Sequence, residues 1–198
     1  MKHTLKSVSA LAATLITFGS LAGGANGAII TFNGNQPDGN TFTTLTTYVE
    51  NGFTLTNTAG VNLLVDNDFS GAGISSIDDD ALANDGSTSI FTMTFGGGAF
   101  NLLSLEHIGA FGESGTYSVI GTLVGGESVS DSFSFFAGIL NTHTFTNFNN
   151  LTSAEFASDS GGVSSVLDNI NVVAVPEPSS ALLLGLVALG LVGRRRRD

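Results

Sequence analysis

A run of oxygen-bearing residues from position 66 has the spacing of a metal-binding loop. Asp66, Asp68 and Ser70 occupy alternate positions, and Gly71 follows them. Alternate side-chain oxygens in a tight turn converge on one point, and glycine permits the turn, as in the first half of a calcium loop. The second half departs from that pattern, because its twelfth position is Ile77 rather than Glu. A calcium loop and a solvated acidic loop are therefore the two alternatives.

Asp168 is a further candidate ligand. Parity along a strand expected at 163–173 places Asp168 on the same face as Val166, Ile170 and Val172, so its carboxylate would point with core residues. An ionised carboxylate in such a place needs compensation. One alternative is that Asp168 caps backbone N–H groups at a strand end, and the other is that it binds a structural Ca²⁺.

The charge distribution limits the partners that these carboxylates can have. The chain has 198 residues and a formal net charge of −11, and its six basic residues are Lys2, Lys6 and Arg194 through Arg197. Residues 28–175 hold ten Asp and five Glu but no Lys or Arg. Phosphate binding requires cations, so nucleic acid is excluded as a partner of the body. Each buried carboxylate there needs a backbone donor, a His, a proton or a metal ion.

The residue types give little support to catalysis, and we expect no enzyme. The chain has no Cys, which excludes a thiol nucleophile and a zinc-thiolate site. His107 and His143 would both be needed for a zinc site, and Glu106 faces the opposite side of a strand from its neighbour His107. The sequence contains no Gly-x-Ser-x-Gly elbow for a serine hydrolase. A pair of acids in a cleft is the remaining route to a hydrolase.

The elements that position these residues are predicted to be strands. Alternation with a period of two, interrupted by turn residues, predicts ten or eleven strands and no helix in the body. A long acidic loop is expected at 66–88. Two packed antiparallel sheets, an all-β sandwich of jelly-roll type, are the simplest arrangement. The predicted strands are 28–32, 41–49, 53–57, 61–65, 89–95, 99–108, 116–124, 128–136, 142–148, 151–158 and 163–173.

Residues 1–27 are predicted to be a secretory signal peptide. Lys2 and Lys6 precede an apolar run, and small residues close it before Ala28.

The C-terminus has three parts in a fixed order. Pro176, Glu177 and Pro178 precede an apolar run at 181–193, and Arg194, Arg195, Arg196 and Arg197 follow it. The run would form a helix of about 20 Å, which is short against a hydrocarbon core of roughly 30 Å. The Arg cluster is expected to stay on the cytoplasmic side of the membrane and to leave the body outside.

This tail, residues 175–198, resembles the PEP-CTERM sorting signal. The resemblance implies recognition by an exosortase in the membrane, cleavage near Pro-Glu-Pro, a transient or retained anchor, and delivery to the cell surface or the matrix of a biofilm. The body also resembles domains common among PEP-CTERM proteins, on pieces such as residues 48–53, 97–105 and 167–170. Those domains look like the jelly rolls of carbohydrate-binding modules, which often hold a structural calcium where the first and last strands meet. Asp168 lies in the matching piece.

Three parts of the chain and two functions follow as predictions. The parts are a signal peptide at 1–27, a β-sandwich at 28–174 and a sorting signal at 175–198. The first function is a secreted, exosortase-sorted surface or matrix protein with a non-catalytic structural or adhesive role. The alternative is a calcium-dependent module that binds exopolysaccharide and uses Asp66, Asp68, Ser70 and Asp168. The absence of Trp, and Phe residues that alternate with Ser or Thr as core residues do, count against a strong lectin.

Overall fold

The described part of the chain is built of strands. The computed structural model of the protein describes residues 27–33, 42–65, 80–85, 89–96, 98–158 and 164–175. These residues form thirteen strands, and every strand pair is antiparallel. Within the same ranges, no helix has the length and apolar character to cross a membrane. The predicted antiparallel β-sandwich is confirmed, while the predicted apolar helix at 181–193 lies outside the described residues.

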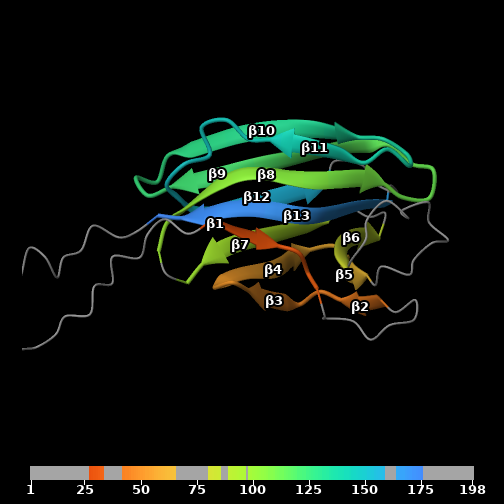
Figure 1. Cartoon of the computed structure of the whole chain (residues 1–198), viewed down its shortest axis with the longest axis horizontal. Coiled ribbons are helices and arrows are strands. Elements are labelled where there is room, and N and C mark those ends of the chain that lie inside the picture. Colours follow the sequence, from red (N-terminus) through yellow and green to blue (C-terminus); the bar gives the residue numbers. More distant parts are fainter. Residues whose placement is uncertain are drawn as a thin grey trace, which may run out of the picture.

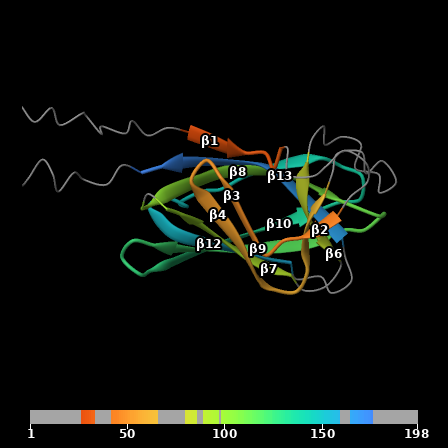
Figure 2. The same ribbon diagram turned by 90° about the horizontal axis from the view of Figure 1, so that it is seen from below.

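The strands lie in two layers, which Figures 1 and 2 show from two directions. Backbone pairing between strands links the two layers at one pair of residues, Phe100 and Leu151. The first layer holds, in spatial order, β2 (Phe42–Thr44), β5 (Asn62–Val65), β6 (Ala81–Asp85), β13 (Ser164–Ala174), β8 (Phe100–Gly109) and β11 (Asn141–Thr144), with β1 (Gly27–Ile30) also beside β13. The second layer holds β3 (Thr47–Glu50), β4 (Phe53–Ala59), β7 (Ile90–Phe95), β12 (Leu151–Ser158), β9 (Gly115–Leu123) and β10 (Ser128–Phe135).

Aromatic and aliphatic side chains from the two inner faces form the main core. Strand β10 illustrates why, because its serines are exposed while Phe133 and Phe135 between them are buried. Each Phe buried in this way contributes about 2 kcal/mol by leaving water. The largest fully buried side chains of the core are Tyr117, Phe32, Phe53, Phe91, Phe100, Phe135, Phe148 and Phe156.

Two parts of the fold differ from the prediction. The predicted strand 41–49 is two strands, because the chain crosses between layers at Leu45 and Thr46, so β2 pairs with β5 and β3 pairs with β4. The predicted loop 66–88 contains β6, whose sequence Ala-Leu-Ala-Asn-Asp is poor in strand-forming residues. Strand β6 is stabilised instead by its two neighbours, β5 and β13.

Both ends of the described chain lie at the same end of the sandwich. Gly27 is opposite Val173 in the pairing of β1 with β13, and Val175 follows directly. The other end of β13 pairs Ser165 with Gly109. The eleven residues of β13 separate these two ends by roughly 35 Å at about 3.3 Å per residue. We call the end at Gly27 and Val175 the tail end.

Candidate functional site

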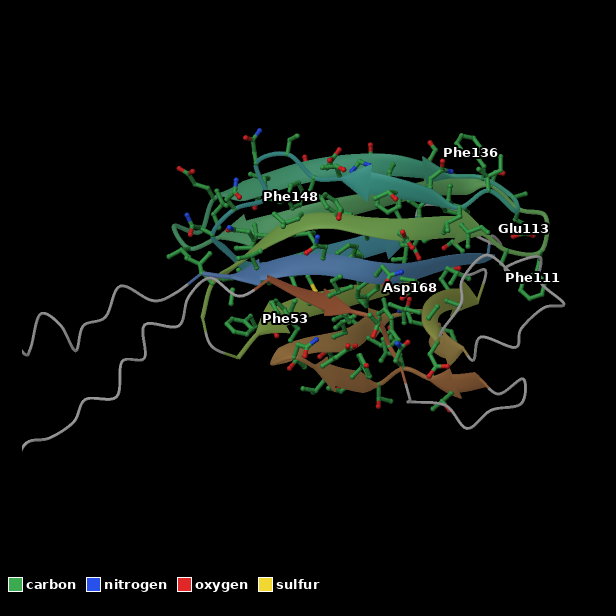
Figure 3. The ribbon with its side chains drawn as sticks, in the orientation of Figure 1. Phe53, Phe111, Glu113, Phe136, Phe148 and Asp168 are labelled. Atoms are coloured by element: carbon green, nitrogen blue, oxygen red, sulfur yellow. The ribbon has the colours of Figure 1, made fainter. Side chains whose placement is uncertain are left out.

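The end of the sandwich away from the tail end exposes three large apolar side chains. Phe111, Phe136 and Ile139 are 57%, 49% and 55% exposed. Phe111, Phe136 and the half-buried Glu113 all lie at this end in Figure 3. We call Phe111, Glu113, Phe136 and Ile139 the aromatic end. Exposed rings beside a carboxylate can pack on the apolar face of a ligand while the carboxylate accepts hydrogen bonds from its polar groups.

The two loops that carry these side chains are joined by hydrogen bonds. The Gly109 N–H donates to the Phe136 carbonyl and the Gly138 N–H donates to the Gly109 carbonyl, both at 3.0 Å. The Ala137 N–H donates to the Ser114 hydroxyl oxygen at 3.1 Å. These bonds hold the loops in one arrangement before any ligand arrives, which lowers the entropic cost of binding.

Backbone geometry at Gly109 and Phe111 shows how closely the loops are packed. A Cβ atom on Gly109 would lie 2.1 Å from the Glu113 carbonyl oxygen and 2.9 Å from the Phe136 carbonyl carbon, so only glycine fits. Phe111 has a φ of 52°, a left-handed conformation that costs a bulky residue about 1–3 kcal/mol. Phe111 is more than half exposed in spite of this unfavourable conformation.

The structure places Asp168 on a different face of β13 from the one that parity predicts. Ile170 and Val172 pack in the main core, whereas Val166 packs in a separate small cluster. The parity prediction is wrong because the pairing with β8 shifts after Asp168, where Asn169 has a φ of 47°. Asp168 therefore lies on the outer face of the first layer, although it is 3% exposed.

Asp168 and Glu106 are paired across β13 and β8, and Asn169 binds both carboxylates. The Asn169 N–H donates to Asp168 Oδ1 at 2.7 Å, and Asn169 Nδ2 donates to Glu106 Oε2 at 2.9 Å. Across the described ranges, three or more His, Asp and Glu side chains do not come together as a metal site would require. Asp66, Asp68 and Ser70 lie outside these ranges, so calcium binding by them stays a prediction.

The two histidines of the body lie near each other and contact the same ring, that of Phe133. His107 is buried, and its burial followed by the nearby His143 lowers its pKa to about 4. His143 Nε2 lies 3.0 Å from Asp131 Oδ2, the one contact between a His and a carboxylate among the residues that the structure describes. Within those residues, neither imidazole bonds to a hydroxyl group. The described part of the chain thus offers no His-activated nucleophile.

A groove of about 660 Å³ lies at the tail end, between the β9–β10 hairpin and the last residue of the described chain. Val124, Asn150 and Val175 are among its lining residues. The Val124 N–H donates to the Asn150 carbonyl, and the Val175 N–H donates to the Ala99 carbonyl, both at 2.9 Å. The C-terminal tail predicted from the sequence therefore begins beside this groove.

One family description, the PEP-CTERM protein-sorting motif, matches residues 174–197. The chain carries a PEP-CTERM sorting motif. The match starts at the last residue of β13 and includes Pro176, Glu177, Pro178 and the four arginines. The motif marks an exported protein that an exosortase sorts to the cell surface through its C-terminus, as predicted.

Solved structures similar to this chain include carbohydrate-binding modules. TmCBM61 in complex with β-1,4-galactotriose has a TM-score of 0.43 and 11% identity, over 62% of this chain and 88% of that one. CBM29_1, a family 29 module from Piromyces equi, has a TM-score of 0.42 and 8% identity, over 70% and 93%. The agarase AgWH50C has a TM-score of 0.41 and 7% identity, over 76% and 25%. A comparison with curated proteins found no match.

The sequence prediction overlooked the aromatic end, although two signals pointed to it. Phe135 and Phe136 are adjacent in a strand-like run, so one of the two rings must face away from the core. Phe111 stands between Ala110 and Gly112 in a turn, where a large apolar side chain has no strand face to occupy. Treating most Phe residues as core concealed both signals.

Proposed function

We propose that the sandwich is a non-catalytic adhesive component of the extracellular matrix and that it binds polysaccharide at the aromatic end. The observation that carries this proposal is the exposure of Phe111 and Phe136 on loops that are hydrogen-bonded to each other. Sugar rings present C–H faces to aromatic side chains and hydroxyl groups to carboxylates, and Glu113 lies at the same end of the sandwich as both rings. The solved carbohydrate-binding modules with a similar fold are named for binding ligands of this class.

The placement of the sorting motif supports the adhesive role. The motif begins at residue 174, at the tail end, and the aromatic end lies at the other end of β13. A chain held at the surface by its C-terminus would therefore present Phe111 and Phe136 away from its attachment.

Polysaccharide binding can be tested by co-sedimentation of residues 27–175, which contain every described strand, with insoluble β-1,4-galactan, agarose and the producing organism's exopolysaccharide. We expect the double variant F111A/F136A to lose binding about tenfold, because two aromatic contacts contribute roughly 0.5–1.5 kcal/mol each. The control V124A removes a side chain that is also exposed, but at the tail end, and should bind as the wild type does. Equal binding by all three proteins would refute the proposed site, and no binding by any would refute recognition of these polymers.

A structural Ca²⁺ at Asp168 is a second proposal, and the pairing of Asp168 with Glu106 favours it. The two carboxylates are register partners in a body that has no Lys or Arg to balance them. Carboxylate oxygens are ligands that Ca²⁺ prefers, and further oxygens would come from the acidic segment that holds Asp66, Asp68 and Ser70.

Melting temperatures with and without a chelator distinguish the calcium site from a capping role. D168A should lower the melting temperature in both cases, because its carboxylate accepts the Asn169 N–H. A metal role predicts that chelator lowers the melting temperature of the wild type and leaves that of D168A unchanged. A wild type that is insensitive to chelator would leave Asp168 as a cap.

A further inference from the structure

Strand β10 is the longest strand with a single neighbour in the described part of the chain. Its eight residues pair with β9 alone. The other strands with one described neighbour, β1, β2, β3 and β11, have three or four residues each. A strand edge leaves backbone N–H and C=O groups ready to pair with another strand, and short edges limit that risk. Strand β10 lacks this protection.

The pairing of β9 with β10 shows which backbone groups of β10 do not bond to β9. The Leu123 N–H donates to the Glu127 carbonyl at 2.8 Å, so these two residues are a hydrogen-bonded pair. Hydrogen-bonded pairs alternate along an antiparallel ladder, so the residues of β10 that bond to β9 are Val129, Asp131, Phe133 and Phe135. The backbone groups directed to the free edge are those of Ser128, Ser130, Ser132 and Ser134.

One side chain occupies the middle of this free edge. The Ser132 N–H donates to Asp131 Oδ1 at 2.8 Å, and Asp131 Oδ2 lies 3.0 Å from His143 Nε2. His143 belongs to β11, the edge strand of the other layer, so this contact also joins the edges of the two layers. An inward-pointing charge on an edge strand is a known means of preventing unwanted pairing.

We propose that the free edge of β10 can pair with strand β10 of a second copy of this chain, and that in the wild type Asp131, held by His143, prevents this pairing. An antiparallel strand is complementary to itself, so two copies can pair about a twofold axis. Asp131 is the only charged residue in β10, which has no Lys, Arg or Pro, whereas residues 28–175 carry fifteen acidic residues in total. Pairing through β10 therefore brings few like charges of two strongly acidic copies together.

Variants at Asp131 distinguish two ways in which it can prevent pairing, namely its hydrogen bond to the Ser132 N–H and its negative charge. We expect the wild type and D131N to sediment as monomers at about 50 μM, because Asn keeps an oxygen that accepts the Ser132 N–H. D131A removes that acceptor and should associate at least tenfold more tightly, giving dimers in sedimentation velocity. Asp131 is partly exposed, so the fold should tolerate its loss. Should D131A fail to fold, D131V, which suits a strand and has no acceptor, carries the same expectation.

A proline on the free edge tests whether β10 itself is the contact. The Ser130 N–H faces the free edge, so S130P removes no bond to β9 but blocks a second strand. D131A/S130P should be monomeric, and D131A/S130A, which keeps the N–H, should remain dimeric. A monomeric D131A, or a dimer that S130P leaves intact, would overturn the inference. These experiments use no polysaccharide, so their outcome is independent of sugar binding at the aromatic end.

Discussion

Glu50 shows at the scale of a single residue how a body without Lys or Arg satisfies its carboxylates. Glu50 Oε2 accepts hydrogen bonds from the Thr31 N–H, the Phe32 N–H and the Tyr48 hydroxyl at 3.1, 3.0 and 2.7 Å. The two backbone bonds join the residues after β1 to the end of β3 in the other layer. Asp131 and Asp168 are likewise satisfied without a Lys or Arg. Asp131 bonds to His143, and Asp168 accepts the Asn169 N–H.

We therefore expect E50A to lower the free energy of unfolding by about 2–4 kcal/mol, because it leaves three part-buried donors without their acceptor. E50Q keeps one oxygen and should cost less. Urea unfolding of both variants measures the difference. A loss in E50Q as large as that in E50A would show that the charge, rather than the hydrogen bonds, is what matters.

His107 makes stability depend on pH. Burial holds the pKa of His107 at about 4, compared with an ordinary value of 6.5. Between these values the unfolded chain binds a proton that the folded chain does not, so stability falls as the pH decreases from about 6.5 towards 4. The loss can reach about 3 kcal/mol.

The variant H107F should lack this part of the pH dependence, because its ring fills the same space and takes no proton. Urea midpoints of both proteins at pH 7 and pH 4.5 provide the measurement. An equal decrease in the two proteins would assign the effect to other groups.

At the scale of elements, the junction of two loops at Gly109 supports the aromatic end. A methyl group on Gly109 would overlap the Glu113 carbonyl, so G109A must separate the loops. We expect G109A to lower the melting temperature by several degrees and also to weaken polysaccharide binding. The matched control is G125A, because a Cβ there has open space. Reduced stability with full binding would show that the loop junction does not shape the site.

The sequence predicts most of the strands, because alternation and turn residues act locally. It fails where distant partners decide the structure. Strand β6 forms because β5 and β13 pair with it, and the shift at Asn169 moves Asp168 to the outer face. The contact of Asp131 with His143 joins two layers whose positions the alternation pattern does not contain. The aromatic end was missed for a different reason. Phe occurs both in the core and at exposed positions of this protein, so the residue type alone does not distinguish the two.

At the scale of the whole molecule, the separation of the tail end from the aromatic end predicts a dependence on orientation. The chain has no native Cys, so one introduced thiol gives one point of attachment. Immobilised through V124C at the tail end, the protein should capture polysaccharide from solution. Immobilised through I139C, it should not, because the support covers Phe111 and Phe136. Equal capture by the two surfaces would place the binding site elsewhere.

The pairing of β1 with β13 also determines where the molecule can be linked covalently. A chain that begins at Ala28 and ends before Arg194 has no lysine, so its single primary amine is the α-amino group. Ala28 is opposite Val172, three residues before Val175, where the C-terminal segment departs. Aldehydes, isopeptide-forming enzymes and other amine-directed reactions can therefore act only beside the carboxyl-terminal segment. Cross-linking of this kind would tether the protein at the tail end and leave the aromatic end chemically unmodified.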